Sequence, residues 1–214
     1  MNVADFDAWR ERYDEMTYQE MKDFYNRVEM EHPLQQAFNA EAFSRFLAYV
    51  INAIGPIAVL EIGGWKGELA HRILSKTGVI KWHNYEICES AVRQTISLSP
   101  HISPTEWYRP IVPGDFVWNI TLPEASVLVA SHFIEHIKQR ELAILIGNLP
   151  DTIQFVGLQA PIPEFGYDID WAGYHGTHIL EVGWKQVSDL LLRYRFMEIS
   201  TLRDGDFRAF RRAV

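Results

Sequence analysis

The sequence predicts an α/β fold built on a mainly parallel sheet, and three patterns in its order support this. Short apolar runs alternate with amphipathic stretches from about residue 57 onward. This alternation is typical of strands joined by crossover helices, which cover both faces of a parallel sheet. The last two runs are separated by an Asp-Gly turn, which predicts an antiparallel hairpin. A helical segment precedes the first strand. We therefore expect seven strands, helices on both faces and a helical N-terminal extension.

The first part of the chain shows helical rather than strand periodicity. Phe43, Leu47 and Val50 lie on one stripe of an amphipathic helix. The part before this stripe is rich in large aromatic and methionine side chains, which we interpret as packing residues; a lid over a substrate cleft is the alternative. We divide the chain into an N-terminal extension, residues 1–55, and one domain, residues 56–214.

The candidate strands and helices of this domain alternate in order. The strands are Ile57–Ile62, Lys81–Glu86, Trp107–Val112, Ser126–Ser131 and Ile153–Ala160, followed by the hairpin strands Phe196–Leu202 and Phe207–Ala213. The helices between them begin near Gly67, Glu89, Phe133 and Gly183. The runs have strand length and are rich in β-branched and aromatic residues, whereas the stretches between them have helical periodicity.

Composition and charge exclude several kinds of protein. A length of 214 residues with 48% hydrophobic and 22% charged residues fits one globular domain. The net charge of −8, with basic residues spread along the chain, argues against binding to duplex nucleic acid. Cys88 is the only cysteine, so no disulfide can form within the chain. No apolar run reaches membrane-spanning length and no signal-peptide pattern follows Met1, so we expect a cytoplasmic protein.

The most informative segment is the turn after the first predicted strand. Glu61 lies near the end of this strand, and Gly63, Gly64 and Gly67 follow before a helix begins. Glycines permit close approach to a ligand, and a helix N-terminus presents free N–H groups. A pyrophosphate would be repelled by Glu61. An amino-acid zwitterion fits better, because its ammonium group can pair with the carboxylate while its own carboxylate binds the loop amides.

This segment resembles motif I of the class I S-adenosylmethionine-dependent methyltransferases, whose fold is Rossmann-like. The family usually has a glycine where this chain has Trp65, but small-molecule O-methyltransferases similar to the catechol enzymes carry an aromatic residue there. The resemblance implies that Glu61, Gly63, Gly64, Trp65 and Gly67 bind S-adenosyl-L-methionine.

Further segments resemble the same family in order and spacing, from the first predicted strand to the C-terminus. Glu86 ends the second strand and is similar to the acidic residue that binds the ribose hydroxyls, with Ile87 beside the adenine. Asp115 and Phe116 follow a glycine after the third strand, where the family's carboxylate meets the adenine amino group. Ser131 ends the fourth strand, which also resembles the family.

The turn after the fourth strand is the expected place of catalysis. Ligands of open α/β sheets bind at the carboxyl ends of the strands, which places His132, Glu135 and His136 near the acceptor. Methyl transfer depends mainly on alignment and exclusion of water, and a histidine can remove a proton near neutral pH. We expect His132 or His136 to be the base. Alternatively, these histidines cap the next helix or bind a buried carbonyl.

The same residues support a metal-dependent alternative. On a helix, His132, Glu135 and His136 would face one way, and His175 or His178 could complete a divalent-metal site. The segment is similar to the Glu-x-x-Glu-His motif of metal-dependent small-RNA 2′-O-methyltransferases and some quinone O-methyltransferases, with His132 in place of the first glutamate. Our prediction is a site without a metal ion.

The remaining signals concern the acceptor. The loop of residues 161–176 mixes aromatic, acidic and glycine residues, and either closes over the substrate or forms an ordered surface loop. Its candidate acceptor contacts are Tyr167, Asp168, Asp170, Trp171 and Tyr174. The Asn/Asp-Pro-Pro-Tyr/Phe motif of enzymes that methylate exocyclic amines in nucleic acids is missing after the fourth strand, as is the cysteine of cytosine C5 enzymes.

We therefore expect a small-molecule acceptor and keep two rival interpretations. A nicotinamide-dependent oxidoreductase would have Gly-x-Gly-x-x-Gly directly after the first strand, and the chain lacks it. A non-catalytic protein with the methyltransferase fold would bind a ligand or a partner, and Trp65 would be a sign of such divergence.

Overall fold

The structure of the protein is a computed structural model, which describes most of the predicted domain and part of the N-terminal extension. The described residues are 8–9, 11–31, 40–55, 58–74, 76–77, 79, 81–88, 90–91, 93, 108–109, 122, 124–162, 164, 180, 182–201 and 207–213.

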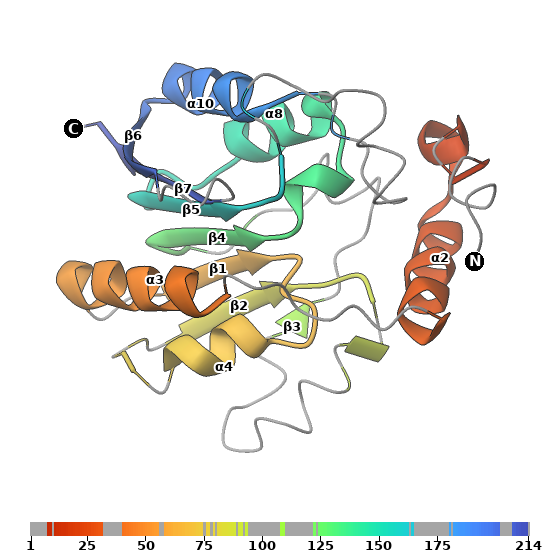
Figure 1. The fold of residues 1–214 in the computed structure, drawn as a ribbon, viewed down its shortest axis with the longest axis horizontal. Coiled ribbons are helices and arrows are strands. Elements are labelled where there is room, and N and C mark those ends of the chain that lie inside the picture. The colour runs from red at the N-terminus through yellow and green to blue at the C-terminus, as the bar shows by residue number, and fades with distance from the viewer. Residues whose placement is uncertain are drawn as a thin grey trace.

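One mixed sheet forms the centre of the molecule (Figure 1). Its strands are β1 (Ala58–Ile62), β2 (Lys81–Tyr85), β3 (Tyr108–Arg109), β4 (Val127–Ser131), β5 (Phe155–Gln159), β6 (Phe196–Thr201) and β7 (Phe207–Arg212). The seven strands lie in the order β3-β2-β1-β4-β5-β7-β6. β1 to β5 pair in parallel, whereas β7 is antiparallel to both β5 and β6. The predicted mainly parallel sheet with a C-terminal antiparallel hairpin is confirmed.

Helices cover both faces of this sheet, as predicted. In Figure 1, α3 (Ala40–Ile54) and α4 (Glu68–Leu74) lie on one face, and α8 (Gln139–Gly147) and α10 (Trp184–Arg193) lie on the other. The remaining elements are α2 (Tyr18–Glu31) and two short 3-10 helices, η1 (Tyr13–Glu15) and η2 (Ile134–His136). Among the described helices, none has the length and apolar character needed to cross a bilayer.

Alternating strand residues build two cores, one under each helical layer. Val59 of β1 packs with Phe43 and Leu47 of α3, whereas its neighbour Leu60 packs with the core that contains Leu142 of α8. All five side chains are at most 1% exposed. Burial of one such side chain contributes roughly 1.5–3 kcal/mol, so the packing of the two helical layers on the two faces of the sheet stabilises it. The helix that was predicted as the end of the N-terminal extension therefore packs directly on the sheet.

The strand order reverses beside β1, because β2 lies on one side of it and β4 on the other. In open parallel sheets, ligands bind in the crevice that such a reversal leaves at the carboxyl ends of the strands. The fold therefore points to the ends of β1, β2 and β4 as the functional edge.

The N-terminal helix α2 lies beyond this edge (Figure 1). Trp9, Tyr13, Met21 and Phe24 form a small buried cluster, and Ile87, just after β2, packs against it. The rings of Trp9 and Phe24 are stacked with their centroids 4.8 Å apart. The prediction that the aromatic residues before residue 40 are packing residues is thus confirmed for these side chains.

The helix predicted to begin near Phe133 begins later. A 3-10 turn, η2, comes first, then Ile137 has extended backbone angles, and α8 starts at Gln139. The carboxylate of Glu141 accepts a hydrogen bond from the Lys138 backbone N–H at 2.8 Å, which caps the helix there. The helix predicted near Glu89, most of the third predicted strand and the hairpin turn lie largely outside the described residues.

Candidate functional site

The turn between β1 and α4 requires its glycines. Gly63 and Gly67 have positive φ angles of 69° and 70°, which glycine adopts without strain. A Cβ at Gly63 would lie 2.7 Å from Phe133 Cδ2, so the backbone also approaches its neighbour closely. Trp65, with a φ of 46°, adopts the left-handed region without being glycine. The turn predicted from the sequence is therefore present, and Trp65 rather than a glycine lies at its tip.

Asn84 of β2 holds this turn from the side. Its side chain is fully buried, and its Oδ1 accepts a hydrogen bond from the Gly64 backbone N–H at 3.2 Å. Its Nδ2 has no hydrogen-bond partner within the described part of the chain. Such an amide is expensive to bury, so it marks a place where a ligand can bind. Sequence reasoning missed Asn84, although a polar residue inside a buried strand was a signal.

The two predicted carboxylates lie at neighbouring strand ends, and both are buried. Glu61 is 1% exposed and Glu86 is 3% exposed. Burial raises the pKa of Glu61 to about 7; a hydrogen bond from Trp82 opposes this shift, and the nearby charge of Glu86 adds to it. Trp82 Nε1 donates that bond to Glu61 Oε2 over 2.8 Å. A cationic group beside Glu61 would offset the free-energy cost of burying the charged carboxylate.

Glu86 binds backbone amides with both of its oxygens. Its Oε2 accepts a hydrogen bond from the Trp65 N–H, and its Oε1 accepts one from the Cys88 N–H, each at 2.8 Å. Glu86 therefore links the tip of the glycine turn to the segment after β2. Gly63 reinforces this link, since its N–H donates to the Tyr85 carbonyl at 2.8 Å.

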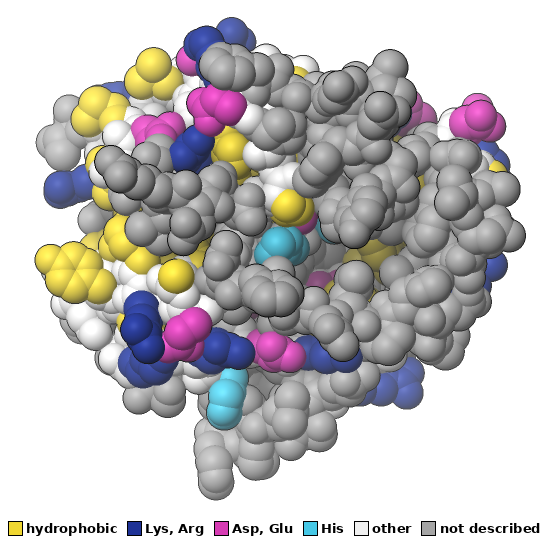
Figure 2. All heavy atoms as spheres, viewed as in Figure 1, with side chains coloured by type: hydrophobic (Ala, Val, Ile, Leu, Met, Phe, Trp, Pro, Cys, Tyr) yellow, Lys and Arg dark blue, Asp and Glu magenta, His cyan; other side chains and the backbone are white. Residues whose placement is uncertain are grey.

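The turn after β4 places His132 and His136 around a buried carboxylate, that of Glu135. Glu135 is fully buried, and its Oε1 lies 3.3 Å from His132 Nδ1 and 3.9 Å from His136 Nε2. The two imidazoles are partly exposed, at 33% and 18%. Near the middle of the face seen in Figure 2, histidine and acidic side chains lie together in a hollow. The predicted trio is brought together, although Glu135 and His136 lie on a 3-10 turn and His132 precedes it, rather than all three lying on an α-helix.

His132 has a strained backbone. Its φ is 52°, in the left-handed region that few non-glycine residues adopt, although histidine, asparagine and aspartate adopt it more often than the others. Its N–H donates to the Gln159 carbonyl at 2.6 Å, and the hydroxyl of Ser131 donates to Gln159 Oε1 at 3.0 Å. Gln159 of β5 is buried and was missed from the sequence. Strain that is held in place in this way is typical of functional sites.

Comparisons with known proteins add evidence on the fold. No protein-family model matches the chain, and no curated protein matches it. Solved structures do. 1,6-Didemethyltoxoflavin-N1-methyltransferase of Burkholderia thailandensis, crystallised with bound 1,6-didemethyltoxoflavin and S-adenosylhomocysteine, matches with a TM-score of 0.60 and 13% identity. The match covers 91% of this chain and 88% of that protein's chain. N-methyltransferase NodS of Bradyrhizobium japonicum WM9, in complex with S-adenosylhomocysteine, matches with a TM-score of 0.61 and 12% identity. The match covers 93% of this chain and 100% of the NodS chain. The chain has the class I S-adenosylmethionine-dependent methyltransferase fold.

Larger proteins with this methyltransferase fold also match. Human N-acetylserotonin methyltransferase in complex with S-adenosylmethionine has a TM-score of 0.55 and 15% identity, over 92% of this chain but only 56% of the human protein. Many of the similar structures are small-molecule methyltransferases. At these identities the likeness concerns the fold.

Some of the predicted site residues lie outside the described residues. They are Asp115, Phe116, the loop residues Tyr167, Asp168, Asp170, Trp171 and Tyr174, and the two histidines His175 and His178. Ile87 is described and packs between the main core and the aromatic cluster below α2. Among the described residues, no group of three or more side chains is arranged to hold a metal ion.

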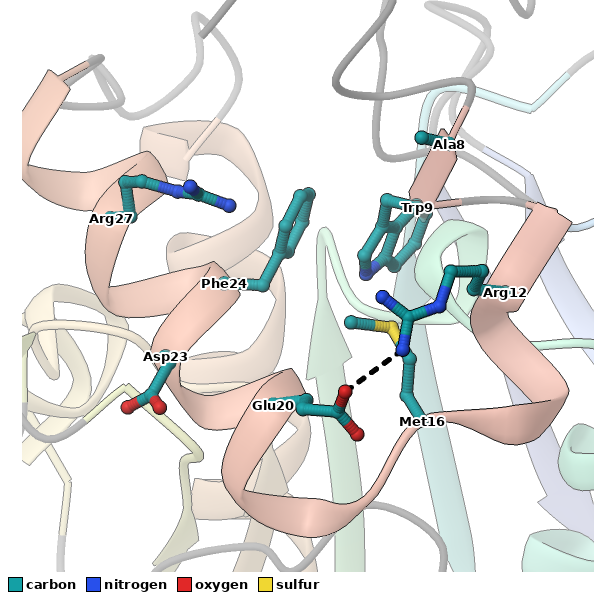
Figure 3. A pocket seen from close by; sticks show the side chains of 8 residues that line it. All are labelled: Ala8, Trp9, Arg12, Met16, Glu20, Asp23, Phe24 and Arg27. Carbon is teal, nitrogen blue, oxygen red and sulfur yellow. Dashed lines mark hydrogen bonds and ion pairs between the residues drawn. The ribbon is translucent and has the colours of Figure 1, made fainter.

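A pocket of about 450 Å³ lies between α2 and the segment before it (Figure 3). Its lining comes from residues 8–27, so it contains none of the side chains at the strand ends. Arg12 and Glu20, on opposite sides of it, form an ion pair at 2.8 Å. Because Trp9 and Phe24 are already stacked on each other, they leave no slot for a planar ligand between them.

Proposed function

We propose that the protein is an S-adenosylmethionine-dependent methyltransferase that acts on the oxygen or nitrogen of a small molecule. The observation that carries this proposal is the pair of buried carboxylates, Glu61 and Glu86, on either side of the glycine turn. The fold, with its strand reversal beside β1, supports it. Binding proteins and metal-assisted enzymes with this fold are the alternatives.

The residues at this edge fit the cofactor. Glu61 would pair with the ammonium group, and the amides of Gly63, Gly64 and Gly67 would receive the carboxylate. Glu86 would bind the ribose hydroxyls, and Ile87 would pack beside the adenine. Two observations support this assignment: Asn84 Nδ2 has no hydrogen-bond partner among the described residues, and burial raises the pKa of Glu61, whose charged form a nearby ammonium group would stabilise.

The remaining cofactor residues stay proposals from the resemblance alone. They are Asp115, Phe116, Trp65 and Ser131. When bound, S-adenosylmethionine supplies a methyl group on a sulfonium ion, which is reactive enough that the protein needs only to align the acceptor and exclude water.

On the acceptor side, we propose His132 as the base. Glu135 holds Nδ1 of His132, which orients the ring and stabilises its protonated form. His136 lies on the other side of the same carboxylate and would help to position it. We also propose that residues 1–55 form the extension and that α2, within it, covers the acceptor.

Calorimetry with S-adenosylmethionine, S-adenosylhomocysteine and NAD tests the proposed function. We expect the first two ligands to bind and NAD not to bind. Binding of NAD alone would overturn the proposal in favour of an oxidoreductase. Absence of binding by all three would favour a non-catalytic protein.

Replacing His132 by asparagine is expected to slow methyl transfer about 100- to 10,000-fold, the usual contribution of a general base, while cofactor affinity is retained. Asparagine tolerates the left-handed backbone of this position, so the change removes the imidazole without adding strain. Steady-state rates with a methylatable acceptor and calorimetry measure the two quantities. His71→Asn, at an exposed histidine of α4, is the matched control. A full rate in His132→Asn would rule out His132 as the base.

Exhaustive chelation is expected to leave the rate of methyl transfer unchanged, because among the described residues no group of three or more side chains is arranged to hold a metal ion. Activity is measured before and after treatment with EDTA and after Mg²⁺ or Zn²⁺ is added back. Loss on chelation with recovery on addition would instead support the metal-assisted alternative.

A further inference from the structure

The turn that carries the proposed base is short and is held at both of its ends. At its start, the His132 N–H donates to the Gln159 carbonyl at 2.6 Å, so strand β5 fixes this end. At the other end, Ile137 and Lys138 have extended backbone angles before α8 begins at Gln139. The position of this second end therefore depends on what holds Lys138.

Lys138 is held by Glu141, and Glu141 is held in turn by the N-terminal segment. Glu141 Oε2 accepts a hydrogen bond from the Lys138 backbone N–H and a second one from the hydroxyl of Tyr13, each at 2.8 Å. Tyr13 lies in η1, 128 residues before Glu141, and both side chains are less than a tenth exposed. Burial, together with the charge of Glu141, raises the pKa of the Tyr13 hydroxyl well above its ordinary value. The hydroxyl therefore keeps its proton and remains a donor.

Tyr13 is itself fixed by its surroundings. Its ring meets the ring of Trp9 edge-to-face in the aromatic cluster, with centroids 5.5 Å apart. Lys138 Nζ lies over the Tyr13 ring, 5.4 Å from its centroid. The neighbouring Asp14 pairs with Lys138 Nζ at 2.6 Å and also with Arg140. The N-terminal segment thus grips the first turn of α8 through several contacts, of which the Tyr13 hydroxyl makes the buried one.

We infer that Tyr13 is a positioning residue: its hydroxyl, acting through Glu141 and Lys138, fixes the end of the proposed catalytic turn, residues 132–136. This inference rests on the proposed function. Buried polar groups that are paired with one another hold a defined geometry. Alignment supplies much of the rate of a methyl transfer, and a misplacement of about 1 Å can cost about 100-fold. The N-terminal extension would thus set the geometry of the base as well as cover the acceptor.

The contact that responds to this end of the turn is the one between Glu135 and the proposed base. Glu135 precedes Ile137 by two residues, and its Oε1 lies 3.3 Å from His132 Nδ1. The attraction between a carboxylate and an imidazolium weakens as the two groups separate. A displaced turn would therefore stabilise protonated His132 less.

Tyr13→Phe tests the inference, because it removes the hydroxyl and keeps the ring in the aromatic cluster. The titration of the histidine side chains is followed by NMR in the full, ligand-free chain, with the His132 signal assigned from its absence in His132→Asn. We expect the midpoint of the His132 titration to fall by at least about 0.3 pH unit in Tyr13→Phe. The signal of His71, at an exposed position of α4, should titrate as in wild type. An unchanged His132 midpoint overturns the inference.

Turnover separates positioning from stability. In Tyr13→Phe, kcat with a methylatable acceptor is expected to fall at least about threefold, while KM for S-adenosylmethionine stays unchanged. Ile51→Val, which shortens a fully buried side chain of α3, is the control. It should lower the unfolding temperature and leave kcat and the His132 titration unchanged. A Tyr13→Phe protein that only unfolds at a lower temperature would show a merely structural hydroxyl and contradict the inference.

Two variants of Glu141 provide a second test, which also serves if Tyr13→Phe folds poorly. Glu141→Gln keeps an oxygen that can accept both hydrogen bonds, so it is expected to retain most of kcat. Glu141→Leu loses both hydrogen bonds and is expected to lower kcat at least as much as Tyr13→Phe. A glutamine variant that loses as much kcat as Tyr13→Phe overturns the inference, and so does a folded leucine variant with the wild-type rate.

The two proposals fail in distinguishable ways. Calorimetry with S-adenosylhomocysteine measures cofactor binding in wild type and in Tyr13→Phe, and we expect the same affinity in both. An unchanged His132 titration with cofactor binding intact contradicts only the role of Tyr13, whereas absence of cofactor binding in wild type contradicts the proposed function itself.

Discussion

Replacing Glu61 by glutamine is expected to weaken S-adenosylmethionine binding about 100-fold and, at the same time, to stabilise the ligand-free protein at pH 8. The loss of affinity follows because a charged hydrogen bond to an ammonium group contributes up to about 3 kcal/mol. The gain in stability follows because glutamine does not carry the buried charge, yet its amide oxygen can still accept the hydrogen bond from Trp82.

The pH dependence of stability explains why the Glu61→Gln variant is expected to be more stable than wild type at pH 8. The pKa of Glu61 is about 7 in the folded protein against an ordinary value of 4.5, so between these values the folded state keeps a proton that the unfolded chain has released. Stability therefore falls as pH rises through this window. At about 1.4 kcal/mol for each pH unit, the total is about 3 kcal/mol.

Thermal unfolding of the ligand-free proteins at pH 5 and pH 8 measures this difference. About 3 kcal/mol corresponds to roughly 6–12 °C for a chain of this size, so the variant should unfold at a higher temperature than wild type at pH 8 and at nearly the same temperature at pH 5. Calorimetry should show that the affinity of wild type for S-adenosylmethionine rises as pH passes 7, whereas that of the variant does not. A variant that is less stable at pH 8, or that binds the cofactor normally, would contradict this account of Glu61.

Replacing Gly64 by alanine is expected to destabilise the protein by about 1–3 kcal/mol, the range for overpacked cores, and to reduce cofactor binding at least about tenfold. A Cβ at Gly64 would overlap the amide of Asn84, and it would displace the backbone N–H that donates to that amide. Urea unfolding and calorimetry measure the two losses.

A double-mutant cycle shows whether Asn84 is the cause. Asn84→Ala removes the overlapping amide, so Gly64→Ala should be much less destabilising in that background, with a coupling energy of about 0.5–3 kcal/mol. Gly147→Ala is the control, because a Cβ there would lie 3.1 Å from the hydroxyl of Tyr194 and 3.3 Å from two of its ring carbons, and this side chain is exposed. Additive effects of the two changes would show that Asn84 does not confine Gly64.

Much of the fold was predictable because strands and helices leave strong periodic signals. β1, β2, β4, β5 and the hairpin each match a predicted strand to within a few residues, since buried strands are short runs of apolar residues. The start of α8 was not predictable in this way. The apolar run continues through Ile134 and Ile137, but Ile137 and Lys138 have extended backbone angles, and Glu141 caps the helix at Lys138.

The candidate site was predictable where residue type and position coincide. Glu61 lies near the end of β1 and Glu86 directly follows β2, and ligands of parallel sheets bind at these ends of the strands. Asn84, Gln159 and Tyr13 were missed because their roles arise from contacts between distant segments: Asn84 contacts the glycine turn, Gln159 holds the turn after β4, and Tyr13 reaches Glu141 from η1. No local pattern encodes such contacts.

The hydrogen bonds from backbone amides to Glu86 fix the conformation of the glycine turn before a ligand binds. Since the carboxylate already holds the N–H groups of Trp65 and Cys88, the turn is preorganised before anything binds. Little conformational entropy is then lost on association, and the association rate should be limited by diffusion and access rather than by rearrangement of this loop. Glu86 would thus favour fast binding of the cofactor.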